Sequence, residues 1–258
     1  MSRLSQIKHS MSRSMRIFLR DKTIFGSSVF IPLFFLFILP LVMFQDVPSA
    51  IMPSIKAYLV IAMVILLATS TGVSNFAGSI AGDRDHGLYS KLSSMPVSPI
   101  NESIGRIITV LVFSSMGSIL LVSLGILYGA ELSTSAIDLI LVVGIGFIVC
   151  IGASGIGLIV ACFVKSESAA AHVGLAIVLA NYFIGIAVPF ADLPEALKPV
   201  ARISPFSSGN SMIASRILGT DFIGYDPWNF LDLGLLVAFS FMLLAVGLVL
   251  YSKLCWRK

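Results

Sequence analysis

The sequence contains few charged residues. Only 12% of its 258 residues are Asp, Glu, Lys or Arg, while 57% are hydrophobic, whereas soluble domains contain about 25% charged and about 45–50% apolar residues. A soluble domain of this length could not cover so much apolar surface with the polar residues available. The shortage of charge therefore argues against a soluble protein and predicts that lipid surrounds much of the chain.

Cysteine and histidine are also rare, with three residues of each. No two cysteines form a C-x-x-C pair, and an odd number cannot complete a disulfide framework. Cys150 and Cys162 lie within apolar runs, where we expect them to be small packing residues. The sequence therefore predicts no metal centre and no redox site.

A nucleotide-binding motif is missing as well. The pattern G-x-x-x-x-G-K-[ST], whose backbone amides hold the phosphates of ATP, does not occur. We therefore expect this chain to bind no cofactor of its own. The net charge of +4 fits a membrane surface better than nucleic acid, because the basic residues lie in short segments between apolar runs.

Apolar runs account for the hydrophobic excess. Crossing about 30 Å of hydrocarbon takes roughly 20 helical residues, and six runs qualify as transmembrane helices: 24–44, 57–81, 107–128, 137–164, 169–190 and 230–251. Pro32 and Pro40 should kink or fray the outer end of the first run, and no small-x-small cleavage site follows it. The predicted fold is a single all-α membrane domain over residues 1–258, with a six-span bundle over 24–252.

The basic residues predict the orientation of this bundle. With the N-terminus inside, thirteen lysines and arginines lie in inside segments and four in outside segments. The four outside residues are Lys56, Lys198, Arg202 and Arg216. Because cytoplasmic loops carry the excess of Lys and Arg, both termini, including the tail 253–258, are expected in the cytoplasm.

Residues 1–23 are predicted to form an amphipathic helix. Its apolar side chains recur at helical spacing: Leu4, Ile7, Met11, Met15 and Phe18. Arg13, Arg16 and Arg20 should project to the opposite side, so the helix can lie in the membrane interface with its cations toward anionic head groups. The alternative is a basic, frayed tail that only sets the topology.

The inside loop 82–105 holds a compact charge cluster formed by Asp83, Arg84 and Asp85. Gly87 permits a sharp change of backbone direction, and residues 88–92 can form a short helix that the following prolines prevent from extending. From the residues alone, this segment is either a docking knob for a partner or an ordinary solvated loop.

The loop resembles the cytoplasmic loop of ABC transporter permeases of the type-2 exporter family. Their approximate pattern is E-R-E-x-G-T-x-x-x-L-x-x-x-P-[VI]-[ST], followed by G-[KR]. The positions that match are Asp83, Arg84, Asp85, Gly87, Leu92, Pro96, Val97, Ser98, Gly105 and Arg106. This chain departs from the pattern in having Asp for both Glu residues and Leu88 for Thr.

The outside segment 191–229 resembles the same family independently. Residues 189–197 are similar to its P-x-x-x-L-P-x-x-L stretch, and 203–206 to its N-P-[LF] stretch, with Ser204 in place of Asn. Four prolines break this segment into short pieces, so we expect short helices that dip back toward the membrane between the fifth and sixth spans.

The resemblance implies the membrane-spanning half of an ATP-driven exporter in the plasma membrane. Two permease chains, identical or paralogous, would work with two separate cytoplasmic ATPase subunits, which would bind ATP and magnesium. By the same resemblance, the contacts that couple the two parts would be made by Asp83, Arg84, Asp85, Gly87 and Leu92. We expect no catalytic residue in this chain, and a small amphiphilic molecule, a drug or a lipid as substrate.

Two amides lie inside predicted spans. Asn75 and Asn181 are costly in lipid and should face protein or a cavity, so they either line the transport pathway or make hydrogen bonds within the chain. Five glycines of the fourth span should let helices approach closely, either within the chain or at a dimer seam: Gly144, Gly146, Gly152, Gly155 and Gly157.

Two features bear on other functions. Residues 152–155 resemble the G-x-S-G motif of rhomboid proteases, but the nearest histidine, His172, should lie roughly 9 Å from Ser154 in depth, too far to activate it. An ion-coupled transporter or channel usually has charged residues near the bilayer midplane. Here Asp138 and Asp232 are expected at the outer ends of spans, and no predicted span has a charged residue at its centre, which argues against an ion-coupled transporter or channel.

Overall fold

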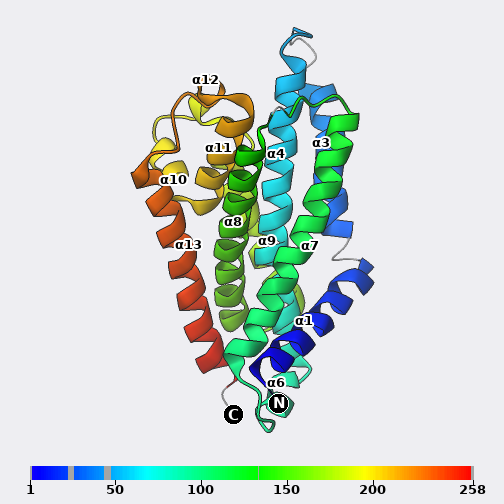
Figure 1. The fold of residues 1–258 in the computed structure, drawn as a ribbon. Helices are drawn as coiled ribbons and strands as arrows, with labels where there is room; N and C mark the ends of the chain where they lie inside the picture. Colours follow the sequence, from blue (N-terminus) through cyan, green and yellow to red (C-terminus); the bar gives the residue numbers. More distant parts are fainter. Residues whose placement is uncertain (1, 23–25, 44–47, 133, 257–258) are drawn as a thin grey trace.

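The computed structural model describes residues 2–22, 26–43, 48–132 and 134–256. Every regular element within these ranges is a helix, and the helices form one elongated bundle (Figure 1). Both ends of the described chain lie at one end of this bundle, together with the short helix α6 (Leu88–Leu92). The prediction of an all-α chain is confirmed for the described residues.

Four continuous helices are long and apolar enough to cross a membrane. They lie where the sequence predicts the second, third, fourth and sixth spans. They are Met52–Asp85, composed of α4 (Met52–Ser70), η2 (Thr71–Asn75) and α5 (Phe76–Asp85); α7 (Pro99–Leu127); α8 (Ala136–Phe163); and Phe230–Cys255, composed of α13 (Phe230–Leu250) and η4 (Tyr251–Cys255). The chain is therefore a helical multi-pass membrane protein.

The first predicted span contains two kinds of helix. A π-helical turn, η1 (Gly26–Phe30), leads into α3 (Ile31–Met43). The change falls just before Pro32, which lacks the N–H needed for a regular helical hydrogen bond, while Pro40 lies inside α3. The predicted ends of this span, Ile24 and Phe44, lie outside the described residues.

The helix α9 (Glu167–Phe183) contains 17 residues. The prediction that this helix continues to residue 190 is wrong, because Gly185, at φ +99°, turns the chain out of the helix. The short 3-10 helix η3 (Phe190–Asp192) follows.

Three short helices follow η3, as the prolines predict. They are α10 (Lys198–Ile203), α11 (Pro205–Leu218) and α12 (Thr220–Ile223). Residues 205–215 of α11 are all buried, and α11 packs against α4, α8 and α13. This segment therefore enters the bundle from the end opposite the termini (Figure 1).

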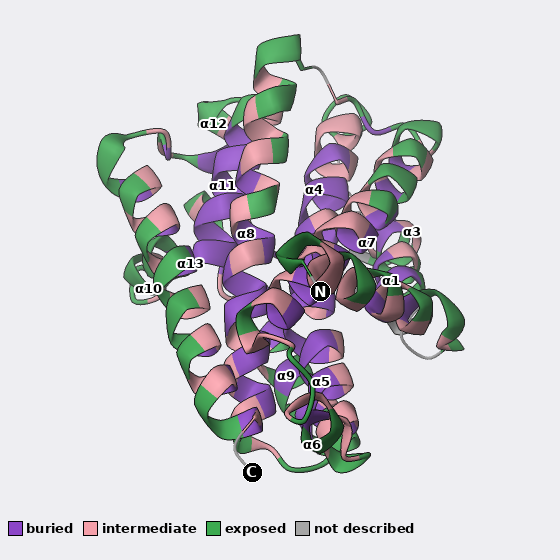
Figure 2. Cartoon of the chain, turned by 60° about the horizontal axis from the view of Figure 1, so that its bottom comes forward, coloured by how far each residue is buried: buried purple, intermediate pink, exposed green. Residues whose placement is uncertain are grey.

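The helix Met52–Asp85 forms the centre of the bundle. Within its most apolar window 89% of the residues are buried, compared with 17% for Phe230–Cys255, which leaves most of α13 on the outside. Figure 2 shows the same distribution, with buried residues concentrated on α4, α5, α8 and α11. The outward faces of the peripheral helices are apolar and exposed, as a lipid-facing surface requires.

Three glycines of α8 allow close contact within the chain. A methyl group at Gly155 would lie 2.5 Å from backbone atoms of Leu243 and Leu244 in α13, Gly152 faces Ser240, and Gly157 faces η2. A methyl group at Gly144 or Gly146 would have no atom of a neighbouring helix within 4 Å. These two glycines therefore do not contribute to helix packing inside the chain.

We expect the Gly155→Val variant to lower the melting temperature of the detergent-solubilised protein. Its side chain would collide with the backbone of α13, and overpacking typically costs about 1–3 kcal/mol. The matched control is Gly144→Val, which places the same side chain in the same helix in open space. Equal melting temperatures for the two variants would contradict the close α8–α13 contact.

Candidate functional site

The loop between α5 and α7 is shorter than the sequence suggests. The helix α5 continues through Asp85, and α7 already begins at Pro99. Gly87 reverses the direction of the chain before α6. Its backbone has φ +68°, a left-handed conformation that residues other than glycine rarely adopt. The predicted short helix at 88–92 is confirmed, and it projects from the end of the bundle that holds both termini (Figure 1).

A buried ionic network lies beneath α6. Arg106 of α7 is 1% exposed, and its guanidinium group contacts the carboxylates of Glu102 and Asp83. The second carboxylate oxygen of Asp83 accepts a hydrogen bond from Arg13 of α1 (Arg3–Arg20). Asp83 therefore joins α1 and α7 to the end of α5.

The network continues through two tyrosines. The hydroxyl of Tyr251 in η4 donates to the second carboxylate oxygen of Glu102. The ring of Tyr251 meets the ring of Tyr89 of α6 edge to face, with 5.7 Å between centroids, and the guanidinium carbon of Arg106 lies 5.9 Å from the Tyr89 centroid. Burial raises the pKa of the Tyr89 phenol, so this group remains neutral.

Two cations and two anions make up the charged part of the network. Because isolated charges are very costly to bury, such groups are tolerated only when they are paired and hydrogen-bonded. The ion pairs connect α1, α5 and α7, and the contacts of the two tyrosines add α6 and η4. The short helix α6 is thus attached to a charge-balanced base, through Tyr89, rather than to a mobile loop.

Arg84 makes a second connection between elements. Its guanidinium group donates to the carbonyl oxygens of Ala161, at 2.8 Å, and of Lys165, at 3.0 Å, and also contacts that of Val164. The last carbonyls of a helix have no partner within the helix, so this cation caps α8. Arg84 therefore fixes the end of α5 against the end of α8.

The five predicted coupling residues do not share one surface. Asp83 and Arg84 point inward, to the contacts just described, and Leu92 packs against the buried cluster that includes Tyr89 and Tyr251. Gly87 forms the turn. Asp85 is exposed, and its carboxylate forms no ion pair with any of the described residues.

A cavity of about 510 Å³ lies between α3, the α4–η2 helix and α9. Most of its lining is apolar, and polar side chains from η2 and its neighbours include Ser70 and Asn75. Asn75 donates to the hydroxyl of Ser28 beside the cavity. Asn181 does not line it: its amide donates to the carbonyl of Ile177 and accepts from Ser204 at 2.8 Å.

A family model described as "ABC-2 type transporter" matches residues 5–218. The chain belongs to the ABC-2 type transporter family. The match begins in α1, includes α6 and the ionic network except Tyr251, and ends with α11. No curated protein matches the chain. ABC-2 chains are membrane-spanning transport subunits, and the family in general works with an ABC ATPase.

Residues 3–20 of this ABC-2 chain form the helix α1, and its predicted apolar face packs inward except at Leu4. Phe18 and Ser14 are buried, whereas Leu4 is 77% exposed. Arg13 does not project to the opposite side with Arg16, because it turns to Asp83. The helix packs on α7, where a methyl group at Gly105 would lie 2.6 Å from the carbonyl oxygen of Ile7.

Two acidic residues at the opposite end of the ABC-2 bundle are paired with arginines. Asp232 lies 3.5 Å from Arg202, and Asp138 lies 3.4 Å from Arg216. Arg216 also lies over the ring of Trp228, at 4.3 Å from the centroid.

The serine-protease interpretation fails on geometry. The Ser154 hydroxyl is fully buried and donates to the carbonyl of Cys150. His172 contacts Ser168 in the first turn of α9. No hydrogen bond between described residues joins this serine to a histidine, as nucleophile activation requires.

The three cysteines are free thiols, and Cys150 and Cys255 are buried. The sulfurs of Cys162 and Cys255 lie 3.7 Å apart. Within the described part of the chain, no group of three or more His, Cys, Asp or Glu side chains could hold a metal ion.

Sequence reasoning missed Glu102 and Tyr251. A signal for Glu102 did exist, because it precedes Arg106 by four residues and such pairs meet on one helix face. Tyr251 had no local signal, since its partner Glu102 is 149 residues away in the sequence.

We expect Arg106→Met to lower the unfolding free energy by about 3–5 kcal/mol, because it leaves the buried carboxylates of Glu102 and Asp83 without their cation. Thermal or denaturant unfolding in detergent measures this loss. The control is Arg16→Met on the exposed face of α1, where the change should stay within about 0.5 kcal/mol. A loss in Arg106→Met that is as small as the loss in Arg16→Met would show that the network does not stabilise the fold.

Proposed function

We propose that this chain is the permease subunit of an ABC-type exporter in the plasma membrane. In this proposal α3 and α9 complete a set of six spans, and α6, α1 and both termini face the cytoplasm. The distribution of charge supports the orientation. Eleven lysines and arginines of the described residues belong to segments at the α6 end, and four belong to the other end.

One observation carries the proposed coupling to an ATPase. The helix α6 is fixed at its inner side through Tyr89, while Asp85 and Lys91 remain exposed beside and on it. A helix that is held firmly on one side and open on the other can transmit a push from a docked protein. A loop without such attachment would absorb the same displacement.

The connections define where the motion goes. A displacement of α6 reaches α7 and η4 through Tyr89, Arg106 and Tyr251. A displacement of α5 reaches α8 through Arg84. ATP and magnesium belong to the separate ATPase subunit, whose closure supplies the energy, and no residue of this chain performs covalent chemistry. Substrate alone shifts the inward–outward equilibrium only by its difference in affinity for the two states.

The cavity beside Asn75 supports an amphiphilic substrate. Its walls are mostly apolar, and its polar side chains include Asn75 at η2 and Asp192 at η3, which suits a small molecule, drug or lipid with a polar end. Asn75 is our candidate for contact with that polar end. Asn181 is assigned to structure instead, because its amide is committed to Ile177 and Ser204. A second permease chain, identical or paralogous, would complete the pathway.

We expect Asp85→Arg to abolish co-purification of the ATPase with the tagged permease, because it reverses an exposed charge beside α6. The control Glu131→Arg makes the same reversal on an exposed residue at the opposite end of the bundle. Both variants should retain the wild-type melting temperature. ATPase recovery that is unchanged by Asp85→Arg, or equally lost with Glu131→Arg, would falsify docking at this surface.

We expect Asn75→Leu to weaken binding of rhodamine 6G, a fluorescent amphiphile, by about two- to tenfold. The loss corresponds to one hydrogen bond of about 0.5–1.5 kcal/mol, and fluorescence anisotropy of the purified permease measures it. Asn181→Leu is the control, since it removes the same amide outside the cavity and should leave affinity unchanged. The assignment is wrong if Asn181→Leu has the larger effect on affinity.

A further inference from the structure

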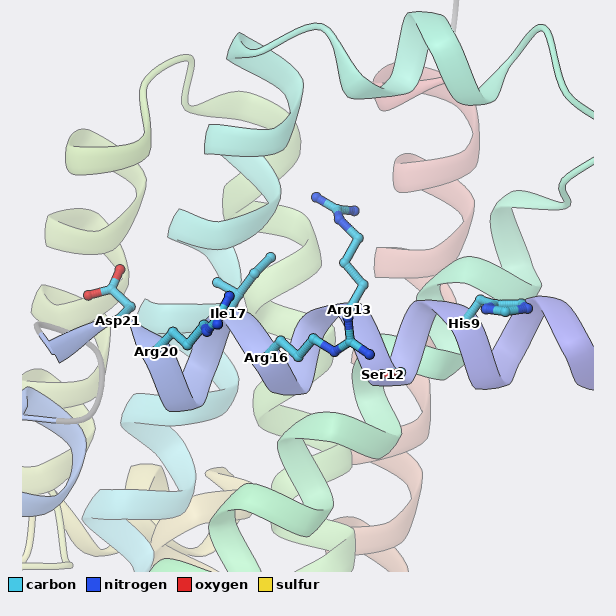
Figure 3. A pocket seen from close by; sticks show the side chains of 7 residues that line it. All are labelled: His9, Ser12, Arg13, Arg16, Ile17, Arg20 and Asp21. Atoms are coloured by element: carbon cyan, nitrogen blue, oxygen red, sulfur yellow. The ribbon is translucent and has the colours of Figure 1, made fainter.

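The outward side of α1 contains an open hollow of about 630 Å³. Figure 3 shows the side chains that line it. They comprise three guanidinium groups, an imidazole, a hydroxyl, an isoleucine and one carboxylate: Arg13, Arg16, Arg20, His9, Ser12, Ile17 and Asp21. The hollow therefore has an excess of positive charge, and the proposed coupling to an ATPase does not use it.

The three arginines differ in what they contact. Arg13 is committed to Asp83, and Figure 3 shows it directed away from Arg16 and Arg20. Arg16 and Arg20 are exposed. They lie four residues apart, on the same helix face. Within the described ranges, neither Arg16 nor Arg20 has an ion-pair partner.

The orientation of α1 is fixed, so this face cannot roll inward. Ser10 donates to the carbonyl of Glu102 at 2.7 Å, and Thr109 donates to the carbonyl of Met11 at 3.1 Å. The close approach of Gly105 to Ile7 holds the same side of the helix against α7. The unpaired cations are thereby held facing away from the bundle.

The location favours a ligand from the membrane. The helix α1 ends at Arg20, and η1, which leads into the apolar helix α3, begins at Gly26, so the hollow lies where the chain enters the membrane. Ile17 lines the hollow, and Leu19 beside it is 50% exposed. Guanidinium groups bind phosphate oxygens in a bidentate manner, while apolar neighbours suit the stem of an acyl chain.

We propose that this hollow binds the headgroup of an anionic phospholipid from the cytoplasmic leaflet, with Arg16 and Arg20 contacting its phosphate. Ser12 and His9 lie beside them as further polar contacts. Arg13 is not part of the lipid contact, because Asp83 already holds it. The inference goes beyond the proposed coupling function: it requires α1 to lie at the membrane surface but does not require an ATPase.

The test uses the full permease chain alone, purified in a neutral detergent and titrated with phosphatidylglycerol or phosphatidylcholine. Native mass spectrometry counts the lipid bound. We expect a preference for phosphatidylglycerol, and an affinity about thirtyfold lower in the R16Q/R20Q variant, since each direct hydrogen bond from a guanidinium group to the phosphate contributes about a factor of five. The matched control, R3Q/K8Q, removes the same charge from exposed residues of α1 outside the hollow and should lose less than threefold.

Several outcomes would overturn the proposal. Equal losses for the two double variants would show a diffuse charge effect rather than a site. Displacement of the lipid by an equal concentration of inorganic phosphate would identify a site for a free anion. R16Q/R20Q that still prefers phosphatidylglycerol, but no longer co-purifies with the ATPase, would assign the hollow to a protein partner.

Single variants keep the test decisive if the double variant does not fold. R16Q and R20Q should each lower the phosphatidylglycerol affinity by about fivefold, and R16K/R20K, which keeps the charge but loses the planar fork, should fall between them and wild type. No change in either single variant rejects the site. Because the readout needs no ATPase, failure of the coupling proposal leaves this result unaffected.

Discussion

Arg106 is buried at the base of the bundle between two carboxylates, and the arrangement of this end of the molecule depends on it. A guanidinium group that is 1% exposed carries a charge that is very costly to bury unless anions lie beside it, and α5 supplies Asp83 and α7 supplies Glu102. The requirement extends outward from there. Asp83 needs Arg13, which holds α1 in place, and Glu102 accepts from Tyr251, which holds the end of α13 through η4.

This network gives the candidate coupling helix a defined position. The helix α6 has five residues, too few to be stable in isolation, so its geometry comes from its surroundings. Tyr89 inserts into the aromatic and ionic base, Gly87 sets the angle of entry, and Arg84 fixes the preceding helix to α8. The ion pairs and ring contacts of this base attach α6 to α7 and η4, and a docked protein can transmit force only through a helix that is attached in this way.

The apolar remainder of the bundle follows different rules. Without a hydrophobic driving force between helices in lipid, close approach depends on small residues, as at Gly155 against α13. The inserted helix α11 fills the half of the bundle opposite the termini, where Asn210 donates to the Tyr58 hydroxyl. The cavity beside Asn75 lies between α3, the α4–η2 helix and α9. Ion pairs therefore hold the end of the bundle near α6, whereas mostly apolar side chains surround the candidate pathway.

The sequence by itself determined that lipid surrounds much of the protein. It also determined the approximate positions of the long helices, and the turn at Gly87 with the short helix that follows it. These features depend on composition and local periodicity, which neighbouring residues establish. Only the tertiary structure decided which polar residues meet: Glu102 with Tyr251, Arg84 with the end of α8, and Arg216 with Asp138. It also decided that Asn75 rather than Asn181 lies beside the cavity. Each pairing depends on how one helix is rotated and tilted against another that is distant in the chain, and hydropathy does not encode that rotation.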